Sequence, residues 1–368
     1  MIDYTGLGLA LILKYKYFLL SMSCLFLGGA GAWFISRTPM RLSLMDWPND
    51  RSSHSVPTPR GGGIGIFLAV ILAGLALKLP TNFLFPIIVV SMIGFYGDFF
   101  QLSVRFRLIV QLSAAFFVVF SLLPNITSSY LQSHPNLFFL LIVLIPIVTA
   151  IYIVGSANFF NFMDGINGIA GISGTICFGL LGMYGFVKGQ DASFSQLSLF
   201  SIYVALACIG FIPFNIPKAK VFLGDVGSIL LGFTFAVIVV AFSRDYFDIL
   251  CLSTFLFPFY ADELTTMIVR LKDRENLIEP HRRHLYQILA NEMEIAHWKV
   301  SAGYGLCQLL IGIGMIVIRP YGICPVIIYL TCTLLSFVVL TTTVRIRVRR
   351  QLSVSVLSDE QTKHGRSL

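Results

Sequence analysis

Long apolar segments recur along the whole chain, and they limit its fold more than any other feature of the sequence. They lie at about 17–36, 62–79, 83–97, 108–123, 137–156, 168–187, 197–214, 227–242, 249–269, 300–318 and 323–343. A helix needs roughly 17–25 such residues to cross a bilayer. Only 12% of the residues are charged, where a soluble domain averages about 25%. We therefore expect an all-α, polytopic membrane protein with about eleven spans, or ten if one short segment does not cross.

The basic residues are distributed unevenly between the two sets of loops. Of the 26 lysines and arginines, 20 lie in the loops 37–61, 98–107, 157–167, 215–226 and 270–299 and in the tail from residue 344. The positive-inside rule places these segments in the cytoplasm, although Lys14 and Lys16 argue weakly for the opposite. We expect one membrane domain over residues 1–343 and a flexible, basic cytoplasmic tail over 344–368. Nothing resembles a nucleic-acid-binding module.

One cytoplasmic loop carries a dense set of polar side chains. The segment 158–171 reads N-F-F-N-F-M-D-G-I-N-G-I-A-G, with Asn158, Asn161, Asp164 and Asn167 between two apolar segments. A charged side chain at the centre of a membrane costs roughly 2.5–3.5 kcal/mol, so polar clusters at this depth usually mark a site. Asn and Asp also supply the oxygen ligands that Mg²⁺ and Ca²⁺ prefer. The alternative is a polar helix end with glycine-mediated packing.

The first loop combines prolines, basic residues and three consecutive glycines. Residues 46–63 read D-W-P-N-D-R-S-S-H-S-V-P-T-P-R-G-G-G. We expect Asn49, Arg51, His54 and Arg60 to bind an anionic substrate, because charge-assisted donors suit phosphates. The glycines would expose backbone N–H groups to an anion at the start of the next helix. The alternative is a rigid loop that only obeys the positive-inside rule.

Two further loops place a carboxylate near basic residues. Asp98 precedes Arg105 and Arg107, an arrangement that forms either an ion pair or a base beside a phosphate clamp. Asp225 follows Lys220 and lies in the frame Gly-Asp-x-Gly-Ser at the start of a span. It is either an N-cap or the ligand of a cation that bridges to a diphosphate.

The fifth loop contains two histidines and two arginines in succession. His281, Arg282, Arg283 and His284 predict a dense anion site. A His-x-x-His zinc site is the rival interpretation, disfavoured because no further Cys or His ligand lies nearby at a familiar spacing. The seven cysteines form no C-x-x-C pair and are typical of apolar packing residues. No pattern indicates a P-loop, a dinucleotide fold or a Ser-His-Asp hydrolase.

In combination, these motifs resemble the polyprenyl-phosphate N-acetylhexosamine-1-phosphate transferases, or glycosyltransferase family 4. The resemblance covers Asp46 to Gln287. It rests on D-x-P-N-x-R-S-x-H-x-x-P-T-P-R-G-G-G, N-x-x-N-F-x-D-G-x-N-G, F-L-G-D-x-G-S and H-R-x-H-L-Y-Q. The first and last motifs look closest to the branch that initiates O-antigen synthesis. The resemblance implies a bacterial inner-membrane enzyme that transfers a sugar-1-phosphate from a UDP-N-acetyl sugar to undecaprenyl phosphate and releases UMP. It implies Mg²⁺ as cofactor, with Mn²⁺ as the alternative, and leaves a homodimer open.

The resemblance also implies roles for single residues. Asp225 and Asn161 would ligate Mg²⁺, and Asp164 would shape the pocket for metal and nucleotide. Asp98, Asp164 and Asp225 would be the catalytic carboxylates, with Asp98 facing the lipid phosphate. The residues implied to bind substrate are Asn49, Arg51, His54, Arg60, Arg105, Arg107, Asn158, Asn167, Lys220, His281, Arg282, Arg283 and His284.

One position departs from the family pattern. Gly97 stands before Asp98, where relatives usually carry a first Asp that is often regarded as the base for the lipid phosphate. A phosphate has a second pKa of about 6, so much of the acceptor is already dianionic at neutral pH; either a dedicated base is dispensable or Asp98 serves as the base. Two alternatives stay open: a catalytically degenerate member, and a transporter. A transporter would show polar residues in both halves of the chain, whereas here the motifs crowd one face.

Overall fold

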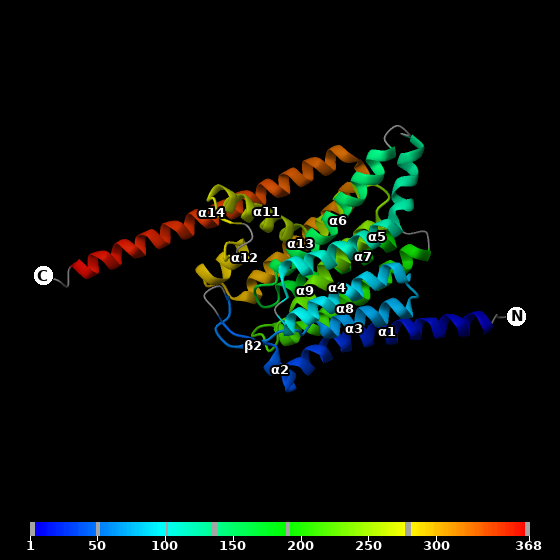
Figure 1. Ribbon diagram of the computed structural model, residues 1–368, viewed down its shortest axis with the longest axis horizontal. Coiled ribbons are helices and arrows are strands. Elements are labelled where there is room, and N and C mark those ends of the chain that lie inside the picture. The colour runs from blue at the N-terminus through cyan, green and yellow to red at the C-terminus, as the bar shows by residue number, and fades with distance from the viewer. Residues whose placement is uncertain are drawn as a thin grey trace.

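The computed structural model describes residues 4–48, 52–100, 102–133, 138–188, 192–276 and 281–364, which form a bundle of helices (Figure 1). The helices are α1 (Tyr4–Arg37), α2 (Met40–Ser43), α3 (Ile64–Ala76), α4 (Thr81–Phe99), α5 (Val104–Ser133), α6 (Phe138–Phe162), α7 (Ile169–Lys188), α8 (Ala192–Asn215), α9 (Asp225–Phe242), α10 (Tyr246–Ser253), α11 (Phe257–Lys272), α12 (Leu285–Gln287), α13 (His297–Ile318) and α14 (Ile323–His364). Short 3₁₀ turns lie at Thr254–Leu256 and Arg319–Tyr321, and one π-helical turn spans Ile288–Glu292. Two short strands, β1 (Met45–Asp46) and β2 (Thr58–Pro59), pair antiparallel.

Nine helices in the described part of the chain are long and apolar enough to cross a membrane. They confirm an all-α, multi-pass membrane protein. The exact count of eleven spans is not confirmed, because the segments expected at 62–79 and 249–269 differ from full-length helices.

The segment expected at 62–79 contains only the 13-residue helix α3. At about 1.5 Å per residue it is roughly 20 Å long, shorter than the roughly 30 Å hydrocarbon core. It begins only at Ile64, because the preceding glycines are bonded to another loop, and its end is followed by Lys78 at φ 55° and Pro80.

The segment expected at 249–269 is broken into α10 and α11. Pro258 lies at the start of α11. Leu256, the residue before that helix, has φ −122° and ψ 23°, outside the α-helical region of backbone angles. Proline is favoured at the first position of a helix, where its missing N–H costs nothing. The break frees α11 to direct Asp262 and Glu263 inward, and both side chains are buried.

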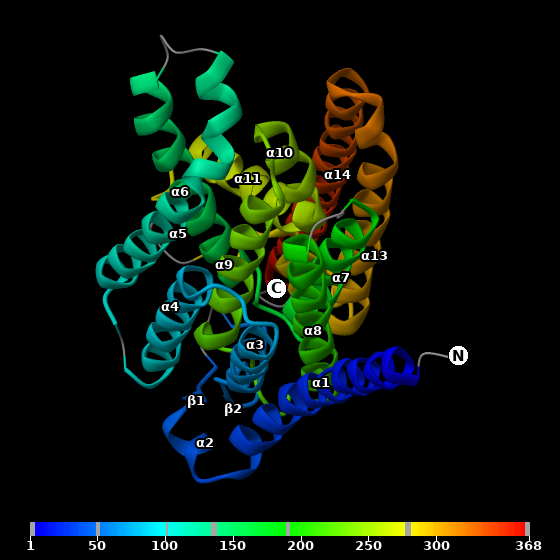
Figure 2. The same cartoon turned by 90° about the vertical axis from the view of Figure 1, so that its right-hand side faces the viewer.

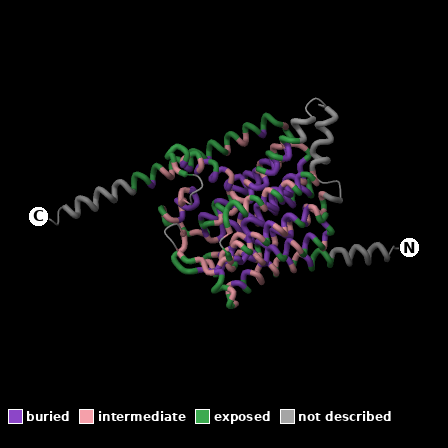
Figure 3. The backbone as a smooth tube through the Cα atoms, viewed as in Figure 1, coloured by how far each residue is buried: buried purple, intermediate pink, exposed green. Residues whose placement is uncertain are grey.

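Helix α9 is the buried centre of the bundle. Every residue from Val226 to Val240 is buried, and the other helices surround α9 in the view along the bundle (Figure 2). A helix that is apolar on all sides is stable only when neighbours cover it completely. The burial map shows the same gradient, with exposed residues along the outer helices (Figure 3).

Helix α14 continues past residue 343, the boundary that hydropathy suggested. The extension contacts α11, because Arg345 Nη2 donates a hydrogen bond to Thr266 Oγ1 at 3.1 Å. All seven cysteines are free; Cys24, Cys177, Cys208 and Cys251 are buried packing residues, whereas Cys307 is partly buried and Cys324 and Cys332 are exposed.

Candidate active site

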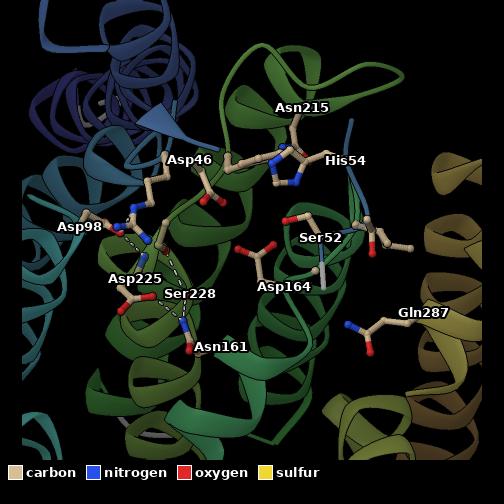
Figure 4. Close-up of a pocket in the computed structure, with 16 residues that line it drawn as sticks. Asp46, Ser52, His54, Asp98, Asn161, Asp164, Asn215, Asp225, Ser228 and Gln287 are labelled. Atoms are coloured by element: carbon tan, nitrogen blue, oxygen red, sulfur yellow. Dashed lines mark hydrogen bonds and ion pairs between the residues drawn. The ribbon is translucent and has the colours of Figure 1, made fainter. Parts of the chain in front are cut away.

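A polar cavity of about 270 Å³ opens at the end of the bundle where β1, β2 and α12 lie (Figures 1 and 4). It is lined by Asp46, Ser52, Ser53, His54, Arg60, Asp98, Asn161, Asp164, Gly165, Ile166, Asn215, Phe222, Gly224, Asp225, Ser228 and Gln287. Four separate loops and helix ends therefore meet in one site, as the motifs predicted.

Backbone pairing joins the two glycine-rich loops. Gly62 N–H donates to Phe222 O at 2.9 Å, and Gly63 N–H donates to Leu223 O at 2.8 Å. At Gly63 a Cβ atom would lie 2.4 Å from Gly227 Cα, so only glycine permits this approach. The N–H groups of Gly62 and Gly63 are thus occupied, and the expectation that they face an anion is not met.

The carboxylate of Asp98 caps the N-terminus of α9. Its Oδ1 accepts the Asp225 N–H at 3.0 Å and its Oδ2 accepts the Val226 N–H at 3.1 Å. Arg60 Nε lies 3.8 Å from Oδ1. The side chain is fully buried, so this carboxylate serves the helix end rather than standing free beside a substrate.

Asp225 is held by two side chains from other helices. Arg107 Nη1 lies 2.5 Å from its Oδ2, and Asn161 Nδ2 donates to its Oδ1 at 2.9 Å. The same amide nitrogen of Asn161 contacts Ser228 Oγ at 2.7 Å. Asn161 therefore turns its nitrogen to Asp225 here, and a metal at Asp225 would require its carbonyl oxygen instead.

Asp164 projects into the cavity opposite Asp225 (Figure 4). Its carboxylate has no hydrogen-bond or ion-pair partner among the described residues. Burial raises its pKa well above the usual range, and the charges of Asp225 and Asp98 raise it further. The ionised form of Asp164 is therefore disfavoured by its surroundings, and a cation bound beside it would favour that form.

The donor set suits Mg²⁺ better than a transition metal. Within the described residues, no three His, Cys, Asp or Glu side chains come close enough to hold a metal between them. Mg²⁺ usually takes one or two carboxylates and completes its shell with water and substrate phosphate. Asp225 and Asp164, with the Asn161 amide, fit that requirement.

His54, Ser53 and Gln287 also line the cavity. The His54 ring packs edge-on against Phe222 with centroids 4.8 Å apart. Asn291, in the π-helical turn, donates to Ser53 Oγ at 3.1 Å and ties this loop to the segment after α12. Gln287 reaches the cavity from the end of α12 (Figure 4).

The basic segment 281–284 lies outside the cavity lining. His284 is buried, with Nδ1 3.7 Å from Asp262 and Nε2 3.4 Å from Glu263. Arg283 pairs with Asp273 and Glu275. Acidic neighbours therefore compensate much of the positive charge that predicted an anion site.

His281 stacks on His284, with ring centroids 4.7 Å apart. Burial lowers the pKa of His281 to about 4, and the positive charge of His284, Arg270 and Arg283 acts in the same direction. The imidazole is therefore neutral at physiological pH and could meet an anion only as a hydrogen-bond donor. Arg282 is partly buried and also lies outside the lining.

Five other predicted binding residues do not line the cavity: Asn158, Asn167, Lys220, Arg105 and Arg107. Asn158 Nδ2 donates to Gln111 on α5 at 2.7 Å, and Asn167 Nδ2 donates to Pro217 O at 3.2 Å, so both connect structural elements. Lys220 lies over the Phe214 ring at 6.0 Å, and Arg105 is exposed. Asn49 and Arg51 lie outside the described residues.

Several lining residues were not predicted. Asp46, Ser52, Ser228 and Gln287 stand inside the quoted motifs, so their motif membership was a usable signal. No sequence motif pointed to Asn215, because its place in the cavity depends on hydrogen bonds with Gly168 N and Val221 O.

These features define a multi-pass membrane protein with an acidic cavity enclosed by loops at one end of its helices. The glycosyl transferase family 4 profile matches residues 81–243 of the chain.

Several curated proteins are similar to this chain over most of its length. The chain is 28% identical over 301 residues to an undecaprenyl-phosphate α-N-acetylglucosaminyl 1-phosphate transferase of Thermotoga maritima, covering 80% of this chain and 90% of the relative. A probable undecaprenyl-phosphate N-acetylglucosaminyl 1-phosphate transferase of Bacillus subtilis is 26% identical, covering 69% and 72%. A phospho-N-acetylmuramoyl-pentapeptide-transferase of Staphylococcus aureus is 27% identical, covering 70% and 85%.

Proposed function

We propose that this protein transfers a sugar-1-phosphate from a UDP-N-acetyl sugar to undecaprenyl phosphate. An oxygen of the lipid phosphate bonds to the sugar-bearing phosphorus of the nucleotide sugar. The bond from that phosphorus to the bridging oxygen breaks, and UMP leaves with the bridging oxygen. Three anionic groups meet in this reaction, so its main requirement is the neutralisation of charge.

The observation that carries this proposal is the convergence of Asp164 and Asp225 in one cavity. Both carboxylates come from the family-matched segment, and Asp164 faces the cavity without a partner among the described residues. Arg60, at the same end, and Arg107, behind Asp225, supply positive charge for phosphoryl oxygens.

Mg²⁺, or Mn²⁺ in its place, is the proposed cofactor. Asp225 and Asp164 would hold it, with Asn161 after a turn of its amide. When bound, it would neutralise the diphosphate and stabilise the charge that develops on the departing UMP. The Asp98 cap keeps Asp225 in place at the start of α9 for this purpose.

The finer parts of the proposal concern the sugar and the setting. We propose an N-acetylhexosamine or N-acetyl-6-deoxyhexosamine donor, a role in starting a lipid-linked surface glycan such as O-antigen, and residence in a bacterial inner membrane. We place the cavity and the α14 tail in the cytoplasm, because the basic loops gather at this end of the bundle. Cysteine-accessibility labelling that put His54 and His281 on opposite sides of the membrane would contradict this orientation.

A UMP-release assay tests the reaction. Purified protein is given Mg²⁺, undecaprenyl phosphate and a panel of UDP-N-acetyl sugars, and the expected result is UMP together with a lipid-linked sugar for at least one donor. Asp225→Asn should lower turnover by at least about 10²-fold, because a neutral amide replaces a charged metal ligand. Lys218→Ala, an exposed change in the same loop, should leave turnover unchanged.

Two results would redirect the proposal. Near wild-type turnover in Asp225→Asn would remove the metal site from this residue. No release from the natural protein, together with release from Gly97→Asp, would make the chain a degenerate family member instead.

A further inference from the structure

Both carboxylate oxygens of Asp225 are already engaged. Oδ2 faces the Arg107 guanidinium at 2.5 Å, and Oδ1 accepts the Asn161 amide at 2.9 Å. Arg107 also neutralises the charge of Asp225. The carboxylate that the proposed function gives to a divalent cation is therefore occupied by a cation of the protein itself.

The two partners of Asp225 are not equally fixed. Asn161 is short and is held a second time by Ser228 Oγ at 2.7 Å. Arg107 has a long, flexible stem in the first turn of α5, is 28% exposed, and Asp225 is its only side-chain partner among the described residues. Arg107 is thus the partner that can leave.

Space for its departure exists beside the pair. Gly97 has no side chain, and even a Cβ atom there would lie 3.8 Å from Leu102 Cδ1 and 3.9 Å from Asp225 Oδ2. Gly97 itself therefore places no side chain next to Asp225 Oδ2. A cation on Asp225 would sit about 2.0–2.1 Å from a carboxylate oxygen, and at such range it would repel the guanidinium.

We propose that Arg107 and a divalent cation exchange on Asp225. In the free protein Arg107 holds Asp225 and lowers its affinity for the cation. When the cation binds, Arg107 leaves Asp225 and turns to a phosphoryl oxygen of a bound substrate or product. This inference rests on the proposed metal site, and it adds that substrate phosphate and metal promote each other's binding through Arg107.

Mn²⁺ binding to the detergent-purified full-length protein, measured by calorimetry without substrate, tests the exchange. If Asp225 is free of Arg107 in about a tenth to a third of molecules, Arg107→Ala should tighten Mn²⁺ binding by about three- to tenfold. Arg107→Gln serves as a second variant should the alanine variant fail to fold. Arg105→Ala removes the same charge two residues away from an exposed side chain and should change affinity less than about twofold.

A second measurement repeats the Mn²⁺ titration with saturating UMP. UMP should tighten Mn²⁺ binding more in the wild type than in Arg107→Ala. In the wild type the phosphate of UMP binds the guanidinium that leaves Asp225, and the variant has no such guanidinium. A structural role for Arg107 alone would not tighten metal binding when the side chain is removed.

The possible failures are distinguishable. Unchanged or weaker Mn²⁺ binding in Arg107→Ala and Arg107→Gln, relative to Arg105→Ala, overturns the exchange and leaves the metal site standing. If UMP tightens Mn²⁺ binding equally in the wild type and in Arg107→Ala, Arg107 does not turn to the phosphate. Mn²⁺ binding that is absent, or that survives Asp225→Asn, overturns the metal site and the exchange together.

Discussion

Asp98 and Asp262 perform the same task at two different helix starts. Asp98 on α4 accepts the N–H groups of Asp225 and Val226 at the N-terminus of α9. Asp262 on α11 accepts the N–H groups of Leu285 and Tyr286 at the N-terminus of α12, at 2.8 and 3.3 Å. Both carboxylates are buried, and each satisfies N–H groups that a helix start otherwise leaves unpaired. Two elements that line the cavity are therefore positioned by carboxylates from neighbouring helices.

The cap predicts how Asp98→Asn behaves. An amide can accept from one of the two N–H groups but presents its own N–H₂ to the other, which costs about 1–3 kcal/mol. We expect a lower melting temperature in detergent and reduced turnover at every pH. Asp46→Asn, which alters the same cavity without capping a helix, should not lower the melting temperature. An unchanged melting temperature with a loss of kcat confined to low pH would instead support the base role implied by the family resemblance.

Two glycines on α4, three residues apart, make a matched pair. At Gly94 a Cβ atom would lie 2.7 Å from Asp225 O, whereas at Gly97 the nearest atom is 3.8 Å away. Gly94→Ala should cost about 1–3 kcal/mol through overpacking and displace the start of α9. Gly97→Ala should be neutral or stabilising by up to about 1 kcal/mol, because alanine favours the helix. Thermal unfolding of both variants checks this order, and a more damaging Gly97→Ala would contradict the geometry.

Gly97→Asp should also fold, for the same reason. It creates the acidic pair that the family resemblance implies but adds a carboxylate near Asp225 Oδ2, and we expect only a modest change in kcat. The UMP-release assay measures it.

The raised pKa of Asp164 makes stability depend on pH in a defined direction. The folded state holds the Asp164 proton more tightly than the unfolded chain, so this group lowers stability as pH rises above its usual value of about 3.9. Asp164→Asn should therefore melt at a higher temperature than the wild type at pH 8, with the difference shrinking toward pH 4. The same variant should lose turnover. A lower melting temperature at pH 8 would mean that the carboxylate is stabilised by its surroundings.

His281 makes stability depend on pH in the opposite direction. Its folded pKa of about 4 lies below the ordinary value of 6.5, so the unfolded chain binds the proton first. Acidification from about 6.5 to 4 should therefore destabilise the protein, and His281→Gln should reduce that loss. Melting temperatures measured across this interval in both proteins provide the check. Equal acid sensitivity of the two proteins would show that His281 is already protonated in the fold.

The sequence by itself determined the class of protein and the neighbourhood of its site. Hydropathy depends on composition along a single segment, so it identified most membrane helices directly. Motif spacing placed Asp98, Asp164, Asp225, His54 and Arg60 among the candidates, and all five line the cavity. These are local properties, because a carboxylate or a glycine-rich turn is written in consecutive residues.

Only the tertiary structure decided which of these groups remain free to act. Asp98 accepts hydrogen bonds from the N-terminus of α9. His284 faces Asp262 and Glu263. Arg283 pairs with Asp273 and Glu275. Asp164 is left without a partner among the described residues. Each outcome depends on residues from different helices, whose distances in space bear no relation to their separation along the chain. Charge and residue type predicted where the site lies. Packing determined whether each charged side chain pairs with a neighbouring residue or faces the cavity.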